Sequence, residues 1–408
     1  METLNDHYRL LLGLDEAWAV EDVNLDLPGL RVEIKLRFVA DRCACPECGA
    51  LHGRADLADE RRWRHLDTMQ FETVIAARIP RSRCPEHGVK TIRAPWAEPH
   101  SRFTLLFEAF AIAVLQATAN VASAAKLLSL DWKACNAIMT AAVERGLQRR
   151  KLEGIDDVGI DEKSFRRGHR YVSVMTDLSS GRVLEVAEGR DTQAAKTLWN
   201  ALPDEQRGDV KGAAMDMWQP YVAATQAAAP EAKIVHDKYH VAAHLNAAVD
   251  QTRRSEHKRL LAVGDDRLKG TKHRWLYGPA RRTPEDRRTL EKLRRAGLKT
   301  GRAWALKEDF RWFWRCVYPE SARTFFQRWH AWAARSRLPA MAKAARMLKA
   351  RLPNLLNYFR RRITNAKAES VNGRIQSLKA SARGFHDFAS YRVRILFHLG
   401  RLDLSITP

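Results

Sequence analysis

Two short segments that contain cysteine constrain the fold of the N-terminal part of this chain more than any other feature. Cys45-x-x-Cys48 lies in CACPECG, and Cys84-x-x-His87 lies in RCPEHG. Two such pairs satisfy tetrahedral zinc and leave no open position, and the neighbouring Pro and Gly suit the tight turns. Strand-like alternation in LRVEIKLRFVA and FETVIAARIP predicts a hairpin that brings the pairs together. We therefore predict a structural zinc site within a β-rich module.

Other assignments of the cysteines remain open. Cys43 and His52 are substitute ligands, and a pair of buried cysteines without metal is the competing interpretation. Cys135 and Cys316 stand alone in sequence with helical spacing and are expected to be small buried hydrophobic residues. Six cysteines are too few for a disulfide scaffold in 408 residues, and no apolar run is long enough to cross a membrane. We expect a cytoplasmic protein without a membrane partner.

Positive charge is concentrated in one late segment of the chain, whose formal net charge is +22. Residues 251–360 contain 29 Lys and Arg against 9 Asp and Glu, whereas residues 151–250 contain 12 against 16. Phosphates bound by such a basic segment release counterions, which favours DNA binding. The expected phosphate contacts are Arg253, Arg254, Arg281 and Arg282. Tryptophans of this segment are expected in a helix-bundle core, with stacking on an unpaired base as the alternative; they are Trp275, Trp304, Trp312, Trp314, Trp329 and Trp332.

A helical hairpin precedes residues 151–250, which we call the acidic segment because acidic residues outnumber basic ones there. Helices over 118–128 and 131–145, joined by a short turn with Asp131 as the N-cap, match a helix-turn-helix in length. Many helical hairpins share this spacing, so DNA recognition and plain packing both remain open. The polar face that would contact DNA consists of Lys133, Asn136 and Arg145.

Carboxylates follow strand-like apolar runs in the acidic segment, where strand and helix patterns alternate over 155–240. Asp161 emerges at the end of the first strand, and Asp216 ends the fourth strand, which is expected beside the first. Glu369 lies on a predicted helix in a polar stripe with Asn365, Asn372, Gln376 and Lys379. Two Mg²⁺ ions about 3.5–4 Å apart need shared carboxylate oxygens of this kind for phosphoryl chemistry.

The segments GIDEKS, AAMDMWQPY, DKYHVAAHLNAAVDQTRR and NAKAESVNGRIQSLK, together with the zinc knuckles, resemble the DDE transposases of the ISL3 insertion-sequence family. The resemblance covers essentially the whole chain. It implies an RNase H-like core and DNA strand cleavage and transfer that depend on two Mg²⁺ (or Mn²⁺) ions per active site. It also implies binding of terminal inverted repeats and target DNA. The triad, which would hold the Mg²⁺ ions, is carried onto Asp161, Asp216 and Glu369.

A further acid competes for the second position, because Asp237 also ends a predicted strand. Related transposases place an acid or a cysteine three residues before a histidine, downstream of the second catalytic acid. We therefore expect Asp237 and His240 to support the active site, together with Asn365 and Asn372. Glu162 is expected to face solvent or to contact the site indirectly. Arg374 and Lys379 are predicted DNA contacts on the helix of Glu369.

These features predict a multi-domain α+β chain with five parts. They are a zinc-binding domain (1–97), a helix-turn-helix domain (98–150), the first part of an RNase H-like α/β core (151–250), a basic all-helical insertion (251–360) and the final core helices with Glu369 (361–408). The resemblance implies a bacterial, nucleoid-associated protein that acts as a homodimer on double-stranded DNA. A zinc-containing DNA-binding regulator and an RNase H-like nuclease without strand transfer are the alternatives.

Overall fold

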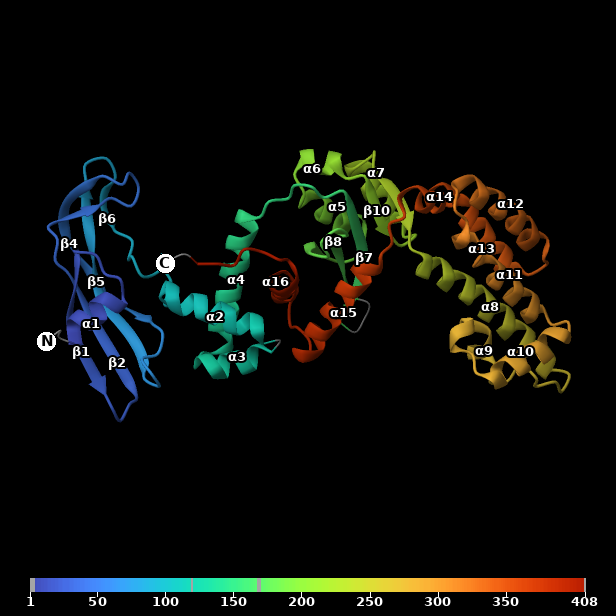
Figure 1. Ribbon diagram of the computed structural model, residues 1–408, viewed down its shortest axis with the longest axis horizontal. Helices are drawn as coiled ribbons and strands as arrows, with labels where there is room; N and C mark the ends of the chain where they lie inside the picture. Colours follow the sequence, from blue (N-terminus) through green and yellow to red (C-terminus); the bar gives the residue numbers. More distant parts are fainter. Residues whose placement is uncertain (1–3, 119, 167–169, 407–408) are drawn as a thin grey trace. The chain divides into compact units, whose positions relative to one another are not determined.

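The computed structural model describes residues 4–118, 120–166 and 170–406 and divides into two compact units. The first unit is Met1–Arg150 with Leu402–Pro408, and the second is Lys151–Arg401. Figure 1 shows their elements coloured along the chain. Within the described residues, no helix is both long and apolar enough to cross a membrane.

A six-stranded sheet forms the beginning of the first unit (Figure 1). The strand order is β1-β2-β5-β4-β3 with β6 paired to β5, and only the β2–β5 pair is parallel. Alternation along β2 buries every second side chain against a cluster of three tryptophans, Trp18, Trp63 and Trp96. The elements are α1 (Leu4–Leu11), β1 (Trp18–Asp26), β2 (Arg31–Phe38), β3 (Arg42–Ala44), β4 (Leu51–Arg64), β5 (Glu72–Cys84) and β6 (Gly88–Thr91).

Three helices complete the first unit: α2 (Leu105–Ala117), α3 (Val121–Leu128) and α4 (Trp132–Arg149). Asp131 caps α4, as predicted, because its Oδ1 accepts a hydrogen bond from the backbone N–H of Ala134 at 2.6 Å. The predicted start of the preceding helix was too early. The helix expected from residue 118 begins at Val121, since the Asn120 side chain accepts from the N–H groups of Ala122 and Ser123.

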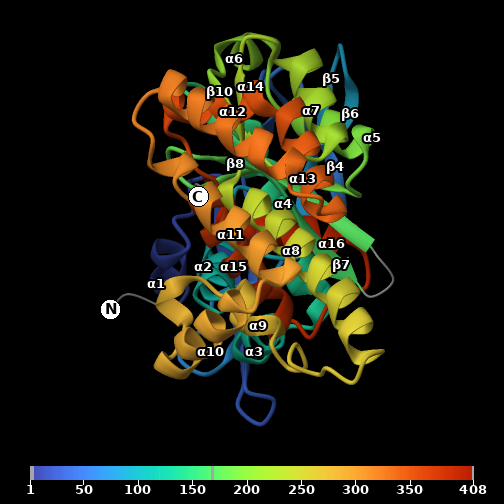
Figure 2. The same ribbon diagram turned by 90° about the vertical axis from the view of Figure 1, so that its right-hand side faces the viewer.

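A five-stranded sheet with the order β11-β10-β7-β8-β9 organises the second unit (Figures 1 and 2). Strands β7, β8 and β9 form an antiparallel meander, and β10 and β11 run parallel to β7. The elements are β7 (Asp157–Arg166), β8 (Arg170–Asp177), β9 (Val183–Glu188), α5 (Thr192–Asn200), α6 (Asp204–Asp209), β10 (Gly212–Met215), α7 (Gln219–Ala228), β11 (Lys233–His236), α15 (Ala366–Ser381) and α16 (Phe388–Leu399).

The two faces of this sheet have different partners because side chains alternate along β7. Val158 and Ile160 belong to the core cluster that includes α5 and α7. Gly159 lies on the opposite face, beneath α15. A Cβ there would lie 2.8 Å from Asn365 Oδ1 and 3.1 Å from the Cβ of Ala368. A glycine at this position therefore allows α15 to approach the backbone of β7 closely.

The chain between β11 and α15 is helical. Its core includes the fully buried Trp275 and Trp329, whereas Trp312 and Trp332 are 55% and 46% exposed. The strand that Asp237 was predicted to end, β11 (Lys233–His236), stops one residue earlier, because Asp237 caps α8 by accepting from Tyr239 N–H at 2.9 Å. The elements are α8 (Lys238–Leu261), α9 (Lys272–Leu276), η1 (Pro279–Arg281), α10 (Pro284–Arg295), α11 (Lys299–Phe310), η2 (Phe313–Arg315), α12 (Pro319–Arg335), α13 (Pro339–Ala350) and α14 (Leu352–Arg361).

Candidate zinc site and active site

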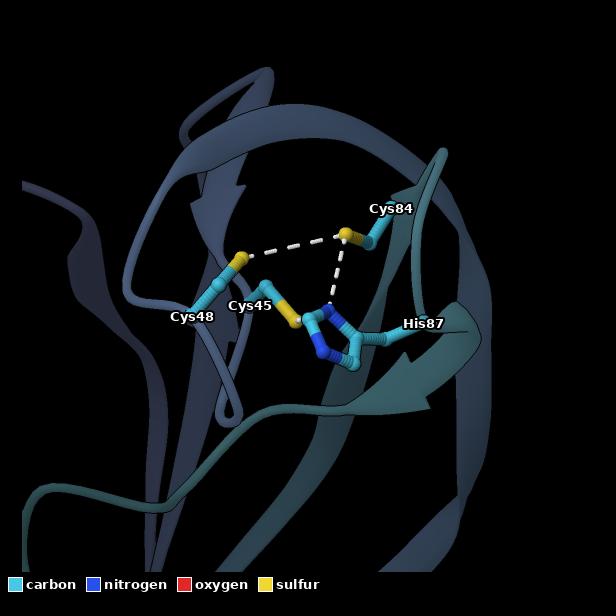
Figure 3. A group of neighbouring side chains, drawn as sticks. All are labelled: Cys45, Cys48, Cys84 and His87. Atoms are coloured by element: carbon cyan, nitrogen blue, oxygen red, sulfur yellow. Dashed lines mark hydrogen bonds between the residues drawn. The ribbon is translucent and has the colours of Figure 1, made fainter.

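Four side chains converge at one end of the first sheet (Figure 3): Cys45, Cys48, Cys84 and His87. Their ligand atoms all lie within 4.8 Å of one another. The sulfurs of Cys48 and Cys84 are 3.8 Å apart, and His87 Nδ1 is 3.5 Å from Cys84 Sγ and 3.9 Å from Cys45 Sγ. Zinc at its usual bond lengths gives tetrahedral edges of about 3.8 Å between two sulfurs and about 3.5 Å between sulfur and nitrogen. The donor set and its spacing therefore fit a structural zinc ion.

Two glycines allow the turns that present these ligands. Gly49 and Gly88 follow Cys48 and His87 directly, and both have positive φ, at 74° and 71°. The backbone N–H of Cys48 bonds the Cys45 thiol and lowers its pKa to about 7, which favours the thiolate that binds metal.

The substitute ligands lie elsewhere. Cys43 is buried and pairs across the β3–β4 ladder with His52, and neither belongs to the converging group. Cys135 is fully buried in α4, as predicted. Cys316 differs from its prediction, because it follows η2 outside any helix and is half-buried.

Three carboxylates lie at the same level of the second sheet. The parallel ladders pair Ile160 with Met215 and Met215 with His236, so the next residue of each strand is an aspartate: Asp161, Asp216 and Asp237. Gly159 and Ala214, two residues before Asp161 and Asp216, pack against Ala368 of α15, and Asp237 lines a pocket together with Glu369 of the same helix. Asp161 itself lies in the middle of β7 and not at its end, because β7 continues as a hairpin with β8.

The helix α15 brings the fourth acid to this group. Asn372 donates from Nδ2 to Asp161 Oδ2, and the N–H of Glu162 donates to Asp161 Oδ1 at 2.8 Å. One turn earlier on α15, Glu369 lies close enough to Asp237 and Asp161 for both to affect its ionisation. Burial, and then the charge of Asp237 and of Asp161, raise the pKa of Glu369. Burial also raises the pKa of Asp161, with a further contribution from Asp237.

The helix α8 supplies the other neighbours of the carboxylates. His240 Nδ1 lies 3.4 Å from Asp216 Oδ1. Asp237 contacts Tyr239 through Oδ1, while its Oδ2 is buried without a hydrogen-bond partner among the described residues. The ends of β11 and α15 enclose a pocket of about 320 Å³ that Asp237, Glu369 and Asn365 line. Asn365 is only 2% exposed, and neither polar atom of its side chain has a partner in the described structure.

Unsatisfied buried oxygens and crowded carboxylates are the features that a divalent cation relieves. Asp237 and Glu369 offer hard oxygen donors in this pocket, Asp161 lies close enough to Glu369 to affect its ionisation, and Asp216 directly follows the neighbouring strand β10. The residues present therefore fit Mg²⁺ or Mn²⁺. The carboxylates are less converged than the zinc ligands, since among the described residues only the Cys45 group has three or more ligand atoms all within 4.8 Å.

Arg190 belongs to this neighbourhood although the sequence did not indicate it. Its guanidinium donates to Glu162 at 3.3 Å and lies 5.3 Å from the ring centroid of the exposed Trp218. Trp218 in turn donates from Nε1 to the carbonyl of Arg190 at 2.7 Å. Glu162 thus has a cationic partner beside the site. In the sequence, the WQPY segment directly after Asp216 could have indicated that Trp218 lies near the site. Arg190 could not be predicted in this way, because it comes from a distant loop.

The predicted DNA contacts differ in how exposed they are. Arg145 pairs with the buried Glu108 at 3.0 Å, Arg253 is held by Asp250 at 2.8 Å, and Arg282 is held by Glu308 at 3.0 Å. These three side chains are engaged inside their units, and only 8% of the Arg282 side chain is exposed. Lys379 donates to the carbonyl of Ser164 at 2.8 Å. The exposed members of the predicted set are Lys133, Arg254, Arg281 and Arg374, and Asn136 is half-buried.

Comparison with known protein families matches each of these regions to a transposase module. The zinc knuckles fall in a match over residues 41–87 to the zinc-finger of transposase IS204/IS1001/IS1096/IS1165. Residues 92–143 match the helix-turn-helix domain of transposase family ISL3, and 158–395, more than half of the chain, match the ISL3 transposase domain. The chain belongs to the ISL3 family of transposases.

Relatives of this transposase extend over nearly its whole length. The transposase for insertion sequence element IS1557 of Mycobacterium tuberculosis is 26% identical over 412 residues, which cover 93% of this chain and 91% of the relative. The transposase for insertion sequence element IS1001 of Bordetella parapertussis is 26% identical over 391 residues, covering 94% and 96%. The ISL3 transposase is therefore a DNA-binding enzyme that mediates transposition, and its zinc-finger match and Cys/His cluster support a structural zinc ion.

Proposed function

We propose that this transposase cleaves and joins DNA strands at the ends of its insertion sequence with Asp161, Asp216 and Glu369 as catalytic Mg²⁺ ligands. One observation carries this proposal: adjacent parallel strands and α15 bring these carboxylates to the same face of one sheet. Bound there, divalent ions would activate the attacking oxygen and stabilise the leaving oxygen of a phosphodiester.

The strand order supports an RNase H-like core as the scaffold. An antiparallel meander of three strands is followed by two parallel strands on the far side of the first, and α15 covers the face that carries the acids. The helices α8–α14 separate β11 from α15 in the chain, which is the arrangement expected of an insertion into such a core. We also propose that the chain consists of the five domains predicted from its sequence.

Neighbouring side chains have distinct roles in the proposed chemistry. Asn372 donates to Asp161 and fixes the direction of its carboxylate. His240, 3.4 Å from Asp216, is placed to hold or move a proton next to that acid. The Asn365 side chain and Asp237 Oδ2 line the pocket without hydrogen-bond partners among the described residues, which leaves them available to a bound phosphate or ion.

The remaining ligands and partners follow from the same proposal. Cys45, Cys48, Cys84 and His87 hold the structural zinc. Exposed cations of the helix-turn-helix and of the helical segment contact phosphates of terminal inverted repeats and of target DNA. Since two element ends must be cut and joined together, the active form is a homodimer on DNA. The place of action is the bacterial nucleoid in the cytoplasm.

The decisive experiment compares wild type with Glu369→Gln on a DNA fragment that contains the element's own end, with Mg²⁺. Gln keeps the shape of the side chain but removes the charge, so nicking at the element boundary should fall at least about 100-fold while DNA binding persists. Glu320→Gln is the control, because Glu320 also lies in the first turn of a helix but away from the site.

Three outcomes are informative. Loss of cutting in Glu369→Gln alone supports the proposal. Binding without cutting by wild type, under conditions that permit dimer assembly, favours the DNA-binding regulator. Cutting without joining of a supplied target duplex favours a nuclease without strand transfer.

A further inference from the structure

A second pocket, of about 960 Å³, opens beside the carboxylate site within the helical segment. Its volume is near the top of the range of roughly 300–1,000 Å³ that is typical of ligand pockets. The lining is unusually aromatic for a surface cavity: Trp304, Trp312, Trp314, Trp332, Tyr239 and Phe310. This pocket has no role in the metal chemistry proposed above.

Three of the aromatic rings at this pocket are accessible to solvent. Trp312, Trp332 and Tyr239 are 55%, 46% and 69% exposed, although the same helices bury Trp275 and Trp329 completely in their core. Packing therefore explains the buried pair but not the exposed rings. Large aromatic surfaces left in water next to a cavity typically mark a binding site.

Charge around the pocket favours an anion. Five cationic and two acidic side chains line it. Lys238 lies 3.8 Å from the ring centroid of Tyr358, and Arg315 lies 4.5 Å from that of Trp312. Neither cation is paired with a carboxylate in the described part of the chain, so both are available to phosphates. The other three cations are held by carboxylates: Lys307 and Arg311 by Glu308, and Arg294 by Glu291.

The pocket adjoins the carboxylate site. Lys238 and Tyr239 line both this pocket and the smaller one that contains Asp237 and Glu369. They form the first turn of α8, whose positive end favours phosphate. A DNA strand with a phosphate at the acids would pass this turn and reach the aromatic pocket with its next nucleotides.

We propose that this aromatic pocket binds an unstacked base of the DNA strand, stacked on Trp312 or Trp332, while Lys238 and Arg315 contact the neighbouring phosphates. Any base presents a π-face to such a surface, and a cationic rim satisfies the backbone. Duplex DNA keeps its bases stacked inside the helix, so the pocket distinguishes an opened end from intact duplex. The inference rests on the proposed function for the position of the strand.

The test uses the full chain and two probes: a short oligothymidine with one central 2-aminopurine, and the duplex formed with its complement. Wild type is expected to quench 2-aminopurine in the single strand by stacking. Trp312→Ala should reduce the quenching and weaken single-strand binding about 5- to 150-fold, the loss of about 1–3 kcal/mol of stacking per base. Trp312→Phe should restore part of both, and Tyr318→Ala, an exposed aromatic residue that does not line the pocket, should change neither.

Equal quenching by wild type, Trp312→Ala and Trp332→Ala would overturn the inference, as would an equal loss of affinity for both probes. Asp161→Asn separates this question from catalysis, because it should abolish cutting of the element end yet retain the quenching. Quenching that depends on Trp312, in a protein that does not cut, would reject the proposed function alone. Cutting by a protein whose quenching ignores both tryptophans would reject the base pocket alone.

Discussion

The zinc knuckles and the carboxylate site gather their ligands in different ways. The zinc ligands come from two turns within residues 45–87 and have their donor atoms within 4.8 Å. The acids come from β7, β10, β11 and α15, spread over residues 161–369, and they do not close to that distance in the described structure. A closed set of four ligands holds a metal for structural purposes, whereas an open set of like charges leaves room for a substrate.

The largest expected effect is the loss of the zinc ion, which should disrupt the zinc site and leave the carboxylate site intact. Cys84→Ser should release the zinc from the first unit and unfold its sheet, because structural zinc contributes about 10–16 kcal/mol to such modules. Metal analysis together with hydrogen exchange of β2 and β5 measures the loss. The second unit should keep its exchange protection.

Cys316→Ser is the matched control, since Cys316 is a half-buried cysteine far from the knuckles in sequence and outside the ligand group. Retention of one zinc ion per chain by Cys84→Ser, with a protected sheet, would contradict the ligand assignment.

The next prediction tests which acid is the second catalytic ligand. Asp216→Asn should reduce cleavage of the element end at least about 100-fold, whereas Asp237→Asn should cost about 10-fold, because Asn still caps α8 and lines the pocket. Single-turnover cleavage with Mg²⁺ measures both. The reverse order of the two losses would make Asp237 the catalytic acid and Asp216 its neighbour.

Local patterns predicted much of both sites. The Cys and His spacing and the Asp131 cap depend on residues near in sequence, so the chain alone reveals them. Asp161 was misplaced at the end of a strand, since only the pairing of β7 with β8 shows that the strand continues.

Long-range packing explains what sequence could not predict. Arg282 is held by Glu308, 26 residues away, and Arg190 reaches Glu162 from the loop after β9, so both lie where no local pattern places them. The aromatic pocket likewise forms only when α8, α11, η2 and α12 pack together. Composition indicated tryptophans in a basic segment but did not show which of them remain exposed.

A smaller effect is expected from the contact that seats α15 on the sheet. In Gly159→Ala the new Cβ would lie 2.8 Å from Asn365 Oδ1 and 2.9 Å from the Leu178 side chain, whose ends can move, and 3.1 Å from the Cβ of Ala368, which would push on α15 and so on Glu369. We expect a loss of about 1–3 kcal/mol in the free energy of unfolding, together with slower cleavage. Urea unfolding and cleavage rates are the measurements.

Gly373→Ala is the control on the same helix, because a Cβ there meets nothing within 4 Å. It should stabilise α15 slightly and leave cleavage unchanged. Equal cleavage by Gly159→Ala and wild type would show that Glu369 tolerates displacement of its helix.

The smallest effect concerns the repulsion between the carboxylates of the open site when no divalent ion is bound. Burial, together with the charge of Asp237, raises the pKa of both Asp161 and Glu369, so with EDTA at neutral pH the ionised carboxylates destabilise the fold. Asp237→Asn removes one charge, keeps the cap of α8 and should raise the melting temperature by about 2–4 °C, equivalent to about 1 kcal/mol in a unit of this size. Mg²⁺ should reduce the difference in melting temperature between Asp237→Asn and wild type, because the ion also neutralises the charge of the carboxylates.

The pH dependence of this stabilisation has a defined sign. A carboxyl whose pKa is raised by folding contributes stability to the fold that is lost as the pH rises through the raised pKa. The gain in melting temperature from Asp237→Asn is therefore full above that range. It should disappear below the ordinary pKa values of 3.8 and 4.5, where the acids are protonated in both states. Asp191→Asn, which changes another capping aspartate outside the cluster, should show no such dependence on pH or Mg²⁺. An identical shift in both variants would mean that capping, not repulsion between metal ligands, distinguishes this site from the closed zinc site.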